Sequence, residues 1–304
     1  MRELCKELAQ IITSEPENLK AWLLKTTGAD EDSLALDCQG NLCWTKKGTG
    51  KRLLFLFCMQ PMGGIVKTVQ SNHCEVIAFT DADSKKIANT VCTFPSGATG
   101  ILRENGENTG DLRLKPFEKV SVGDCFYALT NCECKAEKLY GCQASSIAIL
   151  ALAIACIKAY KDSEYTLNVA VVNVSASGAA KTVQVIDQIH PEGVLVCTTA
   201  DADKGIDLDK GPGLVIKDGG FVAAQPILEK MKRAVADAGV DIQEFVGNIG
   251  DTLAQIYLAS KTKQLAGIYL PVEEPGSGVE EMSVPDIEKT QKLLLKCAAS
   301  FGII

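Results

Sequence analysis

The sequence predicts an α/β fold in which a mostly parallel, mixed sheet is sandwiched by helices and carries an inserted small all-β barrel domain. Residues 53–59 form an unbroken apolar run of strand length, which is typical of a central parallel strand buried on both faces. From residue 139 onward apolar strands alternate with helices, the pattern of a sheet covered on both sides. Residues 67–138 instead contain short alternating segments between turn residues, with no long helical period.

The N-terminal elements lead into this central strand. Helices are expected over residues 2–13 and 17–25, and strands over 34–37 and 42–45 flank a turn with Gly-Asn at its tip. We predict a core made of residues 1–66 and 139–304, with residues 67–138 as the inserted domain. Short strands are expected in the insert over residues 75–79, 90–94, 98–102 and 125–129.

After the insert, strands and helices alternate to the C-terminus. Pro226 in the first turn and Gly239 behind the last turn mark the ends of one helix. Ser283 and Asp286 form a capping box at the start of the last helix. The expected helices are 145–160, 180–189, 227–238 and 283–301, and the expected strands are 167–174, 194–198 and 265–270.

Composition excludes several classes of protein. The formal net charge of −7 argues against nucleic acid or a membrane surface as the main partner. The longest apolar helix candidate, residues 147–157, is too short to span a bilayer, and the chain opens with a charged helix rather than a signal peptide. The 13 cysteines are scattered, many in apolar runs, which indicates reduced thiols and a cytoplasmic protein. Cys125, Cys132 and Cys134 lack the spacing of a structural zinc site, so plain thiols are the preferred interpretation there.

Five stretches match one known family in order and spacing. Residues 37–42 look like a D-x-x-G-N-L hairpin, and residues 56–66 fit the segment L-D-A-H-M-D-E-V-G-F-M-V through Met59, Gly63 and Val66. The other matches are residues 117–124 (FEKVSVGD), 211–218 (GPGLVIKD), and Leu270-Pro271 followed by Val279-Glu280. The chain thereby resembles the glutamyl aminopeptidase family, which includes the self-assembling tetrahedral and deblocking aminopeptidases. The resemblance implies a zinc-peptidase-like core with an inserted barrel and, in active members, a dinuclear zinc centre.

The same resemblance implies that the metal ligands are missing here. Cys58 occupies the position of the family's histidine ligand at the first strand tip, and Gln60 and Pro61 stand in place of Asp and Glu. Asp251 lies where the family has a Thr-Asp turn. The remaining ligand positions fall on Tyr140 or Gly141, on Asn173 and Val174, on Thr198, and on Gly276. We take Cys58, Gln60, Tyr140, Asn173, Thr198, Asp251 and Gly276 as a vestigial binding cleft.

The donor chemistry leads to the same expectation. Catalytic zinc needs three or four N, S or O donors, and two zincs need a bridging carboxylate as well. The two histidines, His73 and His190, do not fall at core strand tips. We therefore predict no catalytic residue, no metal ligand and no cofactor. Cys58 is either a nucleophile beside a base or, preferably, a core thiol in the space of the lost imidazole. The simplest interpretation makes Asp251 a cap and the acidic residues at 273–274 and 280–281 a solvated loop.

We predict a catalytically inactive aminopeptidase-like protein, a pseudoenzyme that serves as a binding or assembly subunit. The alternative is an active metallo-aminopeptidase or other hydrolase with a non-standard site, built on Cys58 or on metals held by Asp201, Asp203 and Asp251. The expected partners are further copies of the chain, as a dimer or larger homo-oligomer, or an active paralogue, with a peptide or small ligand as a further candidate. In the insert, Phe126 and Tyr127 either contribute to such a contact or fill the barrel core.

Overall fold

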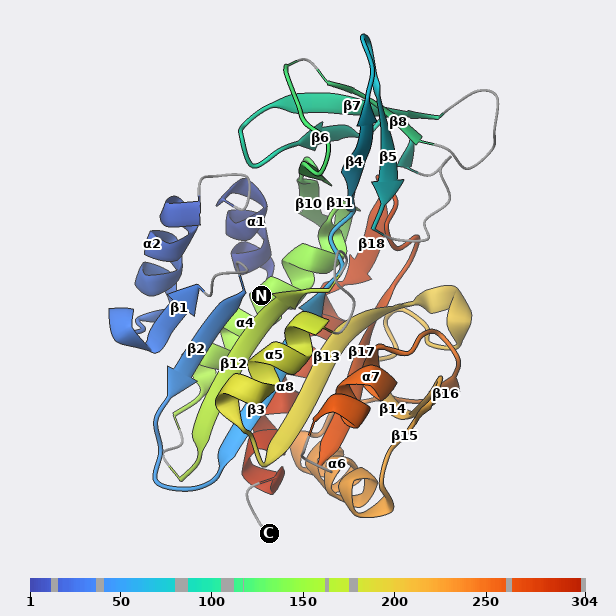
Figure 1. Cartoon of the computed structure of the whole chain (residues 1–304). Coiled ribbons are helices and arrows are strands. Elements are labelled where there is room, and N and C mark those ends of the chain that lie inside the picture. Colours follow the sequence, from blue (N-terminus) through green and yellow to red (C-terminus); the bar gives the residue numbers. More distant parts are fainter. Residues whose placement is uncertain are drawn as a thin grey trace.

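The computed structural model describes residues 1–11, 16–36, 41–79, 87–104, 112–116, 118–161, 164–174, 180–260 and 264–301. Within these residues the chain forms a nine-stranded mixed sheet, a three-stranded sheet and a closed barrel. Figure 1 shows the barrel standing at one end of the large sheet. The predicted fold class is thereby confirmed. Residues 37–40 of the predicted hairpin and Phe117 of the third matching segment lie outside the described residues.

The centre of the large sheet is parallel, as predicted. β3 (Arg52–Met59) lies between β12 (Thr166–Asn173) and β13 (Gly193–Asp201), and β13 pairs in parallel with β17 (Leu265–Val272). Antiparallel pairs flank this centre on both sides. The outer strands are β1 (Leu34–Leu36), β2 (Leu42–Lys46), β14 (Gly213–Asp218), β15 (Phe221–Val222) and β16 (Gln243–Gly247), of which β16 pairs in parallel with β14.

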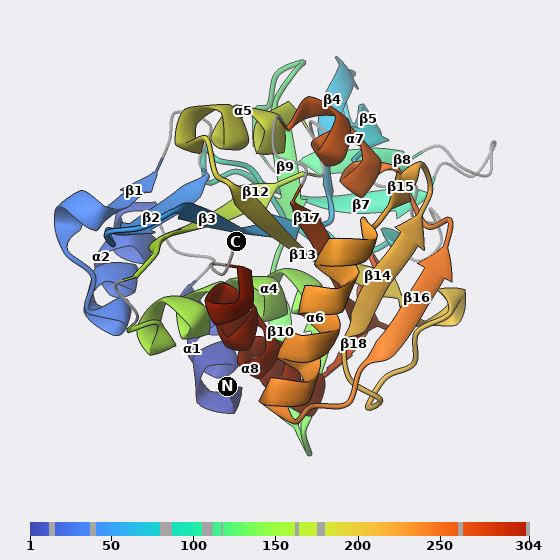
Figure 2. The ribbon, with the colours of Figure 1, turned by 90° about the horizontal axis from the view of Figure 1, so that it is seen from below.

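Helices cover both faces of the sheet. In Figure 2, α1, α4, α6 and α8 lie on one side and α5 and α7 on the other. Among the residues described, no helix is long and apolar enough to cross a membrane. The helices are α1 (Arg2–Ile11), α2 (Pro16–Thr27), α4 (Ala144–Ala159), α5 (Ala180–Ile189), α6 (Gln225–Ala238), α7 (Thr252–Ala259) and α8 (Val284–Phe301), with the short 3₁₀ turns η1 (Glu31–Ser33) and η2 (Ala202–Lys204).

The side chains on the two faces of β3 belong to two separate hydrophobic cores. Successive side chains of a strand point to opposite faces. Leu53, Phe55 and Phe57 accordingly pack with α4 and α8 in one hydrophobic cluster. Leu54, Leu56 and Cys58 pack in the other cluster, with residues of α5 and α7. Burial on both sides explains why the apolar run of this strand is unbroken.

The barrel has a core of its own. Phe126 is 1% exposed and its ring lies 5.8 Å from that of Phe94, so this aromatic residue fills the barrel. The first barrel strand, β4, begins at Gly63 and crosses the predicted domain boundary at residue 66; the division into 1–66 with 139–304 and 67–138 stays a prediction about folding units. The barrel strands are β4 (Gly63–Val69), β5 (Cys74–Ala78), β6 (Val91–Thr93), β7 (Thr99–Glu104), β8 (Leu112–Pro116) and β9 (Cys125–Ala128).

A third sheet connects the barrel to the last helix. β10 (Asn131–Lys135) and β11 (Lys138–Cys142) form a hairpin, and β11 pairs with β18 (Glu280–Ser283) just before α8. None of these three strands was predicted. Cys134 and Cys132 of β10 pack against the main core, so these thiols line an internal contact of the subunit.

The side chain of Gln143 hydrogen-bonds to both segments that connect the core with the barrel. The chain enters the barrel after Met62 and leaves it at Ala128, whose N–H donates to the Met62 carbonyl at 2.9 Å. The amide of Gln143, just before α4, accepts from the Met62 N–H at 3.2 Å. It also donates to the carbonyls of Met62 at 3.1 Å and Ala128 at 3.4 Å. We call this arrangement of Met62, Ala128 and Gln143 the neck.

Candidate functional site

A cavity of ≈ 360 Å³ lies at the carboxyl ends of the central strands. Its walls come from the ends of β3, β13 and β17, the first turns of α4 and α7, and the loop between β17 and β18. Ligand sites of open α/β sheets are found at this position. The lining is mixed, with carboxylates of Asp201, Asp218 and Glu280, one ammonium from Lys204, and hydroxyl groups.

Glu280 is the most enclosed acid of the cavity. Its side chain is 2% exposed, and its two carboxylate oxygens accept N–H groups of Ser145 and Gly276, each at 2.8 Å. Ser145 belongs to the first turn of α4, where backbone N–H groups lack helical partners. Burial raises the pKa of Glu280, and the two N–H donors partly offset that shift. The expectation of a solvated loop at this position is therefore wrong for Glu280.

Asp218 is the second buried acid, at the end of β14. One carboxylate oxygen accepts the N–H of Ile249 at 2.6 Å and that of Gly250 at 3.4 Å. The other accepts the hydroxyl of Tyr269 at 2.5 Å. Burial, followed by this contact with the carboxylate, raises the pKa of Tyr269. Asp218 thus holds the turn before α7 and a tyrosine of β17 in place.

Cys58 lies behind the cavity, inside the hydrophobic core. Its side chain is fully buried among residues packed under α5 and α7, and burial raises the pKa of its thiol to about 12. The Cys58 backbone carbonyl accepts the hydroxyl of Thr198 at 3.0 Å, which joins β3 to β13. His190 follows α5 near the start of β3, where Glu192 donates to Arg52. The strand from Arg52 to Cys58 spans about 20 Å, so this histidine cannot act as the base for Cys58.

The structure gathers three of the seven predicted cleft residues around the cavity. Gln60, Thr198 and Gly276 line it. The other predicted positions are displaced from it. Asn173, at the end of β12, donates to the Tyr127 hydroxyl of the barrel at 3.4 Å, and Tyr140 lies in β11 opposite Glu281.

Asp251 stands between two residues of the cavity wall but is itself exposed. Gly250 and Thr252 line the cavity on either side of it. Asp251 is the N-cap residue of α7 by position, although its side chain makes no capping hydrogen bond there. Its carboxylate instead accepts the N–H of Gly220 at 3.4 Å. The predicted capping role is thus replaced by a contact with the β14–β15 turn.

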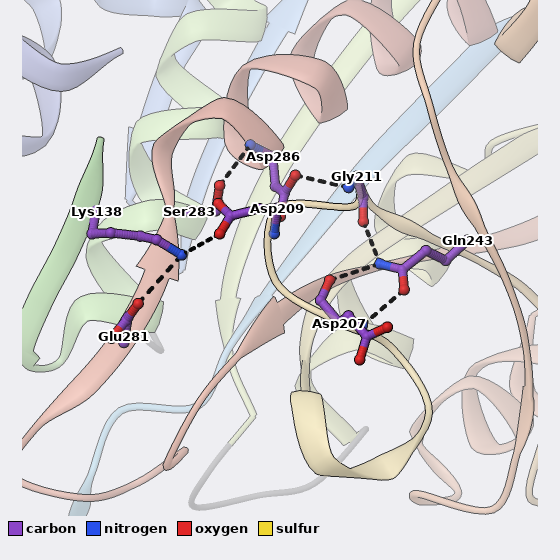
Figure 3. Close-up of polar contacts among 8 residues, drawn as sticks. All are labelled: Lys138, Asp207, Asp209, Gly211, Gln243, Glu281, Ser283 and Asp286. Atoms are coloured by element: carbon purple, nitrogen blue, oxygen red, sulfur yellow. Dashed lines mark hydrogen bonds and ion pairs between the residues drawn. The ribbon is translucent and has the colours of Figure 1, made fainter. Parts of the chain in front are cut away.

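The wall that carries Asp201 and Lys204 is anchored by the loop behind it, shown in Figure 3. Asp286 of α8 is almost fully buried, and its carboxylate accepts the N–H groups of Asp209 at 2.7 Å and Gly211 at 2.8 Å. Gly211 has φ +90°, and a Cβ at this position would clash with the Asp241 carbonyl. The Asp286 N–H meets the Ser283 hydroxyl at 3.4 Å, so the predicted capping box is half formed.

Two further contacts complete this anchor. Gln243 of β16 donates to the carbonyls of Asp207 and Gly211, both at 2.8 Å, and accepts the Asp207 N–H at 2.8 Å. Lys138 of β11 pairs with Asp209 at 2.6 Å and with Glu281 at 3.3 Å. The loop is therefore bound to the third sheet, to α8 and to β16 at once.

The donors around the cavity do not fit a zinc centre. Across the described residues, no three His, Cys, Asp or Glu side chains are grouped so that they could hold a metal ion. The segment after β12, residues 175–179, has the sequence Ser-Ala-Ser-Gly-Ala and adds no such donor. Asp218 and Glu280 direct their oxygens to N–H and O–H groups of the protein. A dinuclear zinc centre needs a bridging carboxylate and further ligands on each metal, whereas the two buried carboxylates of this cavity already accept hydrogen bonds from the protein.

Sequence reasoning missed Asp218, Glu280 and Tyr269 as cavity residues. Asp218 and Glu280 both fall inside the motifs that pointed to the fold, and that position was the available signal. Their burial could not be anticipated, because their partners Ile249 and Ser145 come from distant parts of the chain.

Comparison with known proteins identifies the fold. No protein-family model and no curated protein sequence matches the chain. Aminopeptidase APDkam598 from Desulfurococcus kamchatkensis superimposes with a TM-score of 0.83 at 13% identity, covering 97% of this chain and 94% of that one. The TET aminopeptidase of Thaumarchaeota archaeon SCGC AB-539-E09 gives 0.80 at 17%, covering 97% and 95%. The Pyrococcus horikoshii TET1 peptidase gives 0.77 at 15%, covering 97% and 98%. The chain thus has the fold of the TET-type aminopeptidases along nearly its whole length.

Proposed function

We propose that this chain is a catalytically inactive aminopeptidase-like protein that serves as a binding or assembly subunit. The observation that carries the proposal is that the buried carboxylates of the cavity hold neighbouring elements of the fold together. Glu280 joins α4 to the loop before β18, and Asp218 joins β14 to the turn before α7 and to Tyr269. Each of these carboxylates accepts hydrogen bonds from the protein on both oxygens, from backbone N–H groups or from the Tyr269 hydroxyl, so its position is set by those donors and it serves the fold.

The described residues do not bring together the groups that either of two chemical routes to hydrolysis requires. A metal-activated water needs at least three protein ligands on one metal, and the described residues offer no such group. A cysteine nucleophile needs a thiolate and a nearby base, whereas Cys58 is buried with a raised pKa and is remote from His190. Both observations support inactivity.

Exposed apolar side chains on the barrel support the assembly role. Val69, Ile77, Val91, Val122 and Leu129 are each at least 40% exposed, and all lie in the barrel or in its connecting segments. Large apolar side chains on a surface favour contact with a partner. The Pyrococcus horikoshii TET1 peptidase, which shares this fold, can assemble into a tetrahedron or a large octahedral shell. We propose self-association of this chain in the cytoplasm, alone or mixed with an active paralogue.

Metal content and peptidase activity test the proposal together. The purified chain is incubated with zinc, cobalt or manganese, desalted, and analysed by mass spectrometry for bound metal, with aminopeptidase APDkam598 as the active control. We expect less than one metal per chain and no release of N-terminal residues from peptides. Two metals per chain together with peptide hydrolysis would instead establish the second candidate, an active metallo-aminopeptidase or other hydrolase with a non-standard site. That candidate is favoured only by the three carboxylates that line the cavity.

Light scattering of the native chain tests assembly separately. We expect the mass of a dimer or a larger homo-oligomer at micromolar concentration. The variant Val69→Lys/Ile77→Lys adds charge to the barrel surface and is expected to reduce the mass, whereas Val222→Lys/Val246→Lys on the large sheet is the matched control. A monomeric mass that does not change when an active paralogue is added would overturn the assembly role.

A further inference from the structure

A second and larger cavity, of ≈ 820 Å³, lies at the opposite edge of the large sheet. It is formed by the end of β2, the end of α2 and the C-terminal end of α4. Lys46 at the end of β2 pairs with Leu167 at the start of β12, which places this cavity at the amino ends of the parallel strands. The volume is within the range of small-molecule sites. It lies away from the site described above and has no part in the proposed function.

Four lysines line this cavity, and we call it the lysine cavity. They are Lys46, Lys47, Lys158 and Lys161. Eight other lysines of the described chain form ion pairs, but none of these four does. Asp30 and Asp32 line the same cavity and form no ion pair with them. Four positive charges that outnumber the two carboxylates and form no ion pair with them repel one another, and an anion between them relieves that repulsion.

Lys46 is the most fixed of the four. Its ammonium donates to the Tyr160 carbonyl at 2.8 Å and lies 5.5 Å from the centre of the Tyr160 ring. An ammonium carries three N–H donors, so this contact leaves donors for a ligand. Because the carbonyl and the ring hold the side chain, less conformational entropy is lost when an anion binds.

Trp44 supplies a second, independent observation. It lines the cavity and is 6% exposed, and its buried indole N–H has no hydrogen-bond partner within the described residues. Buried polar groups normally have partners, and an unpaired donor is a sign of an acceptor supplied from outside the chain. The lysine cavity therefore combines unpaired cations with an unpaired neutral donor, and both kinds of group bind oxyanions.

We propose that the lysine cavity binds the phosphate or diphosphate end of a small molecule. The charge on the lining residues selects an anion, since four lysines outnumber Asp30 and Asp32. The volume exceeds that of a phosphate group, so the remainder of the molecule lies in the same cavity. The net charge of −7 would repel anions from the chain as a whole, which makes a local cluster of unpaired cations all the more selective.

The two tryptophans of the chain allow a direct test. Trp22 lies on α2, so the variant Trp22→Phe leaves Trp44 as the sole fluorescent indole, next to the site. Inorganic pyrophosphate is titrated at low ionic strength, with calorimetry on the unaltered chain as a second measurement. We expect a saturable fluorescence change and a calorimetric Kd that agrees with it. Because three of the four lysines are exposed, the Kd should rise with added salt.

A charge-removal pair and a matched pair complete the experiment. Lys47→Gln/Lys161→Gln removes two exposed cations of the cavity, and Lys119→Gln/Lys292→Gln removes two exposed, unpaired cations elsewhere. We expect the first pair to weaken pyrophosphate binding by about tenfold or more and the second to leave it unchanged. The proposal is overturned if pyrophosphate gives no saturable signal by either method at millimolar concentration, or if both pairs bind it equally.

Discussion

The carboxylate of Glu280 accepts the backbone N–H of Ser145 at 2.8 Å, across 135 positions of the chain. Its other oxygen accepts the N–H of Gly276, in the loop between β17 and β18. One buried side chain therefore joins the first turn of α4 to the wall of the cavity.

Glu280→Ala should lower the free energy of unfolding by about 2–4 kcal/mol. The substitution leaves two buried N–H groups without an acceptor, and each such loss costs about 1–3 kcal/mol. Urea unfolding followed by circular dichroism measures the change. Glu273→Ala, an exposed position seven residues earlier in the same loop, is the control and should change stability by less than about 0.5 kcal/mol. Equal effects of the two variants would contradict the role given to Glu280.

The raised pKa of Glu280 makes a prediction about pH. Its ordinary value is 4.5, and burial raises it in the folded chain. Below pH 4.5 the carboxyl is protonated in both states, whereas above it the unfolded chain loses the proton first. The contribution of Glu280 to stability therefore falls as pH rises from 4.5 through the raised pKa. In Glu280→Gln that fall should be absent, so the difference in unfolding free energy between wild type and variant should change with pH across this window. A difference that stays constant would show that the carboxyl is not perturbed.

Asp286→Ala should release the loop behind the cavity. Its carboxylate accepts the N–H groups of Asp209 and Gly211, and we expect a loss of about 2–4 kcal/mol when both donors are left unpaired. Hydrogen exchange should then be faster at Asp209 and Gly211 than in wild type. Asp207→Ala is the control, because its carboxylate makes only an exposed ion pair with Lys210, which is worth less than about 1 kcal/mol. Unchanged exchange at both amides would contradict the anchor.

Substitutions of Cys58 distinguish a core thiol from a nucleophile. Cys58→Ala removes one sulfur atom from a packed cluster and should cost about 1 kcal/mol. Cys58→Ser places a hydroxyl in the same apolar surroundings and should cost more, about 1–3 kcal/mol. Denaturant unfolding of both variants gives the order. A serine variant as stable as wild type would mean that the site is polar, contrary to the packing described.

The neck defines where the barrel can be removed. Met62 and Ala128 are joined by a hydrogen bond of 2.9 Å, so a short Gly-Ser linker can replace residues 63–127 without straining the core. We expect that variant to fold, by circular dichroism, and to elute as a smaller species. Replacing residues 67–138 should destabilise the core, because that cut also removes β10, which packs against α1. If both deletions fold equally well, β10 contributes little to the core.

The sequence predicted the elements whose signals are local. The apolar run of β3 showed burial on both faces, and Pro226 with Gly239 marked the ends of α6 to within two residues. The β10–β11 hairpin was missed for a physical reason. Its turn residues, Ala136 and Glu137, adopt φ values of +43° and +68° without the Gly or Asn that normally indicates such a turn.

The candidate site was predictable only in part. Gln60, Thr198 and Gly276 were found because the family resemblance placed them at ligand positions, and all three line the cavity. Glu280 was assigned to solvent because it sits in an acidic run. Its burial depends on donors from α4 and the preceding loop, which only tertiary structure brings together. Charged residues are seldom buried without partners, and a sequence does not show the partners.

The neck also determines how the barrel can move. Both chain crossings pass side by side through the hydrogen bonds of Gln143, and Asn173 of the core also donates to the Tyr127 hydroxyl of the barrel. A tilt of the barrel about the neck would break bonds to the Gln143 amide. Gln143 therefore helps to fix the direction in which the exposed side chains of Val69 and Ile77 face. A small rotation at this point is magnified at the far end of the barrel, so substitution of Gln143 is expected to alter the geometry of any assembly before it alters the fold of either part.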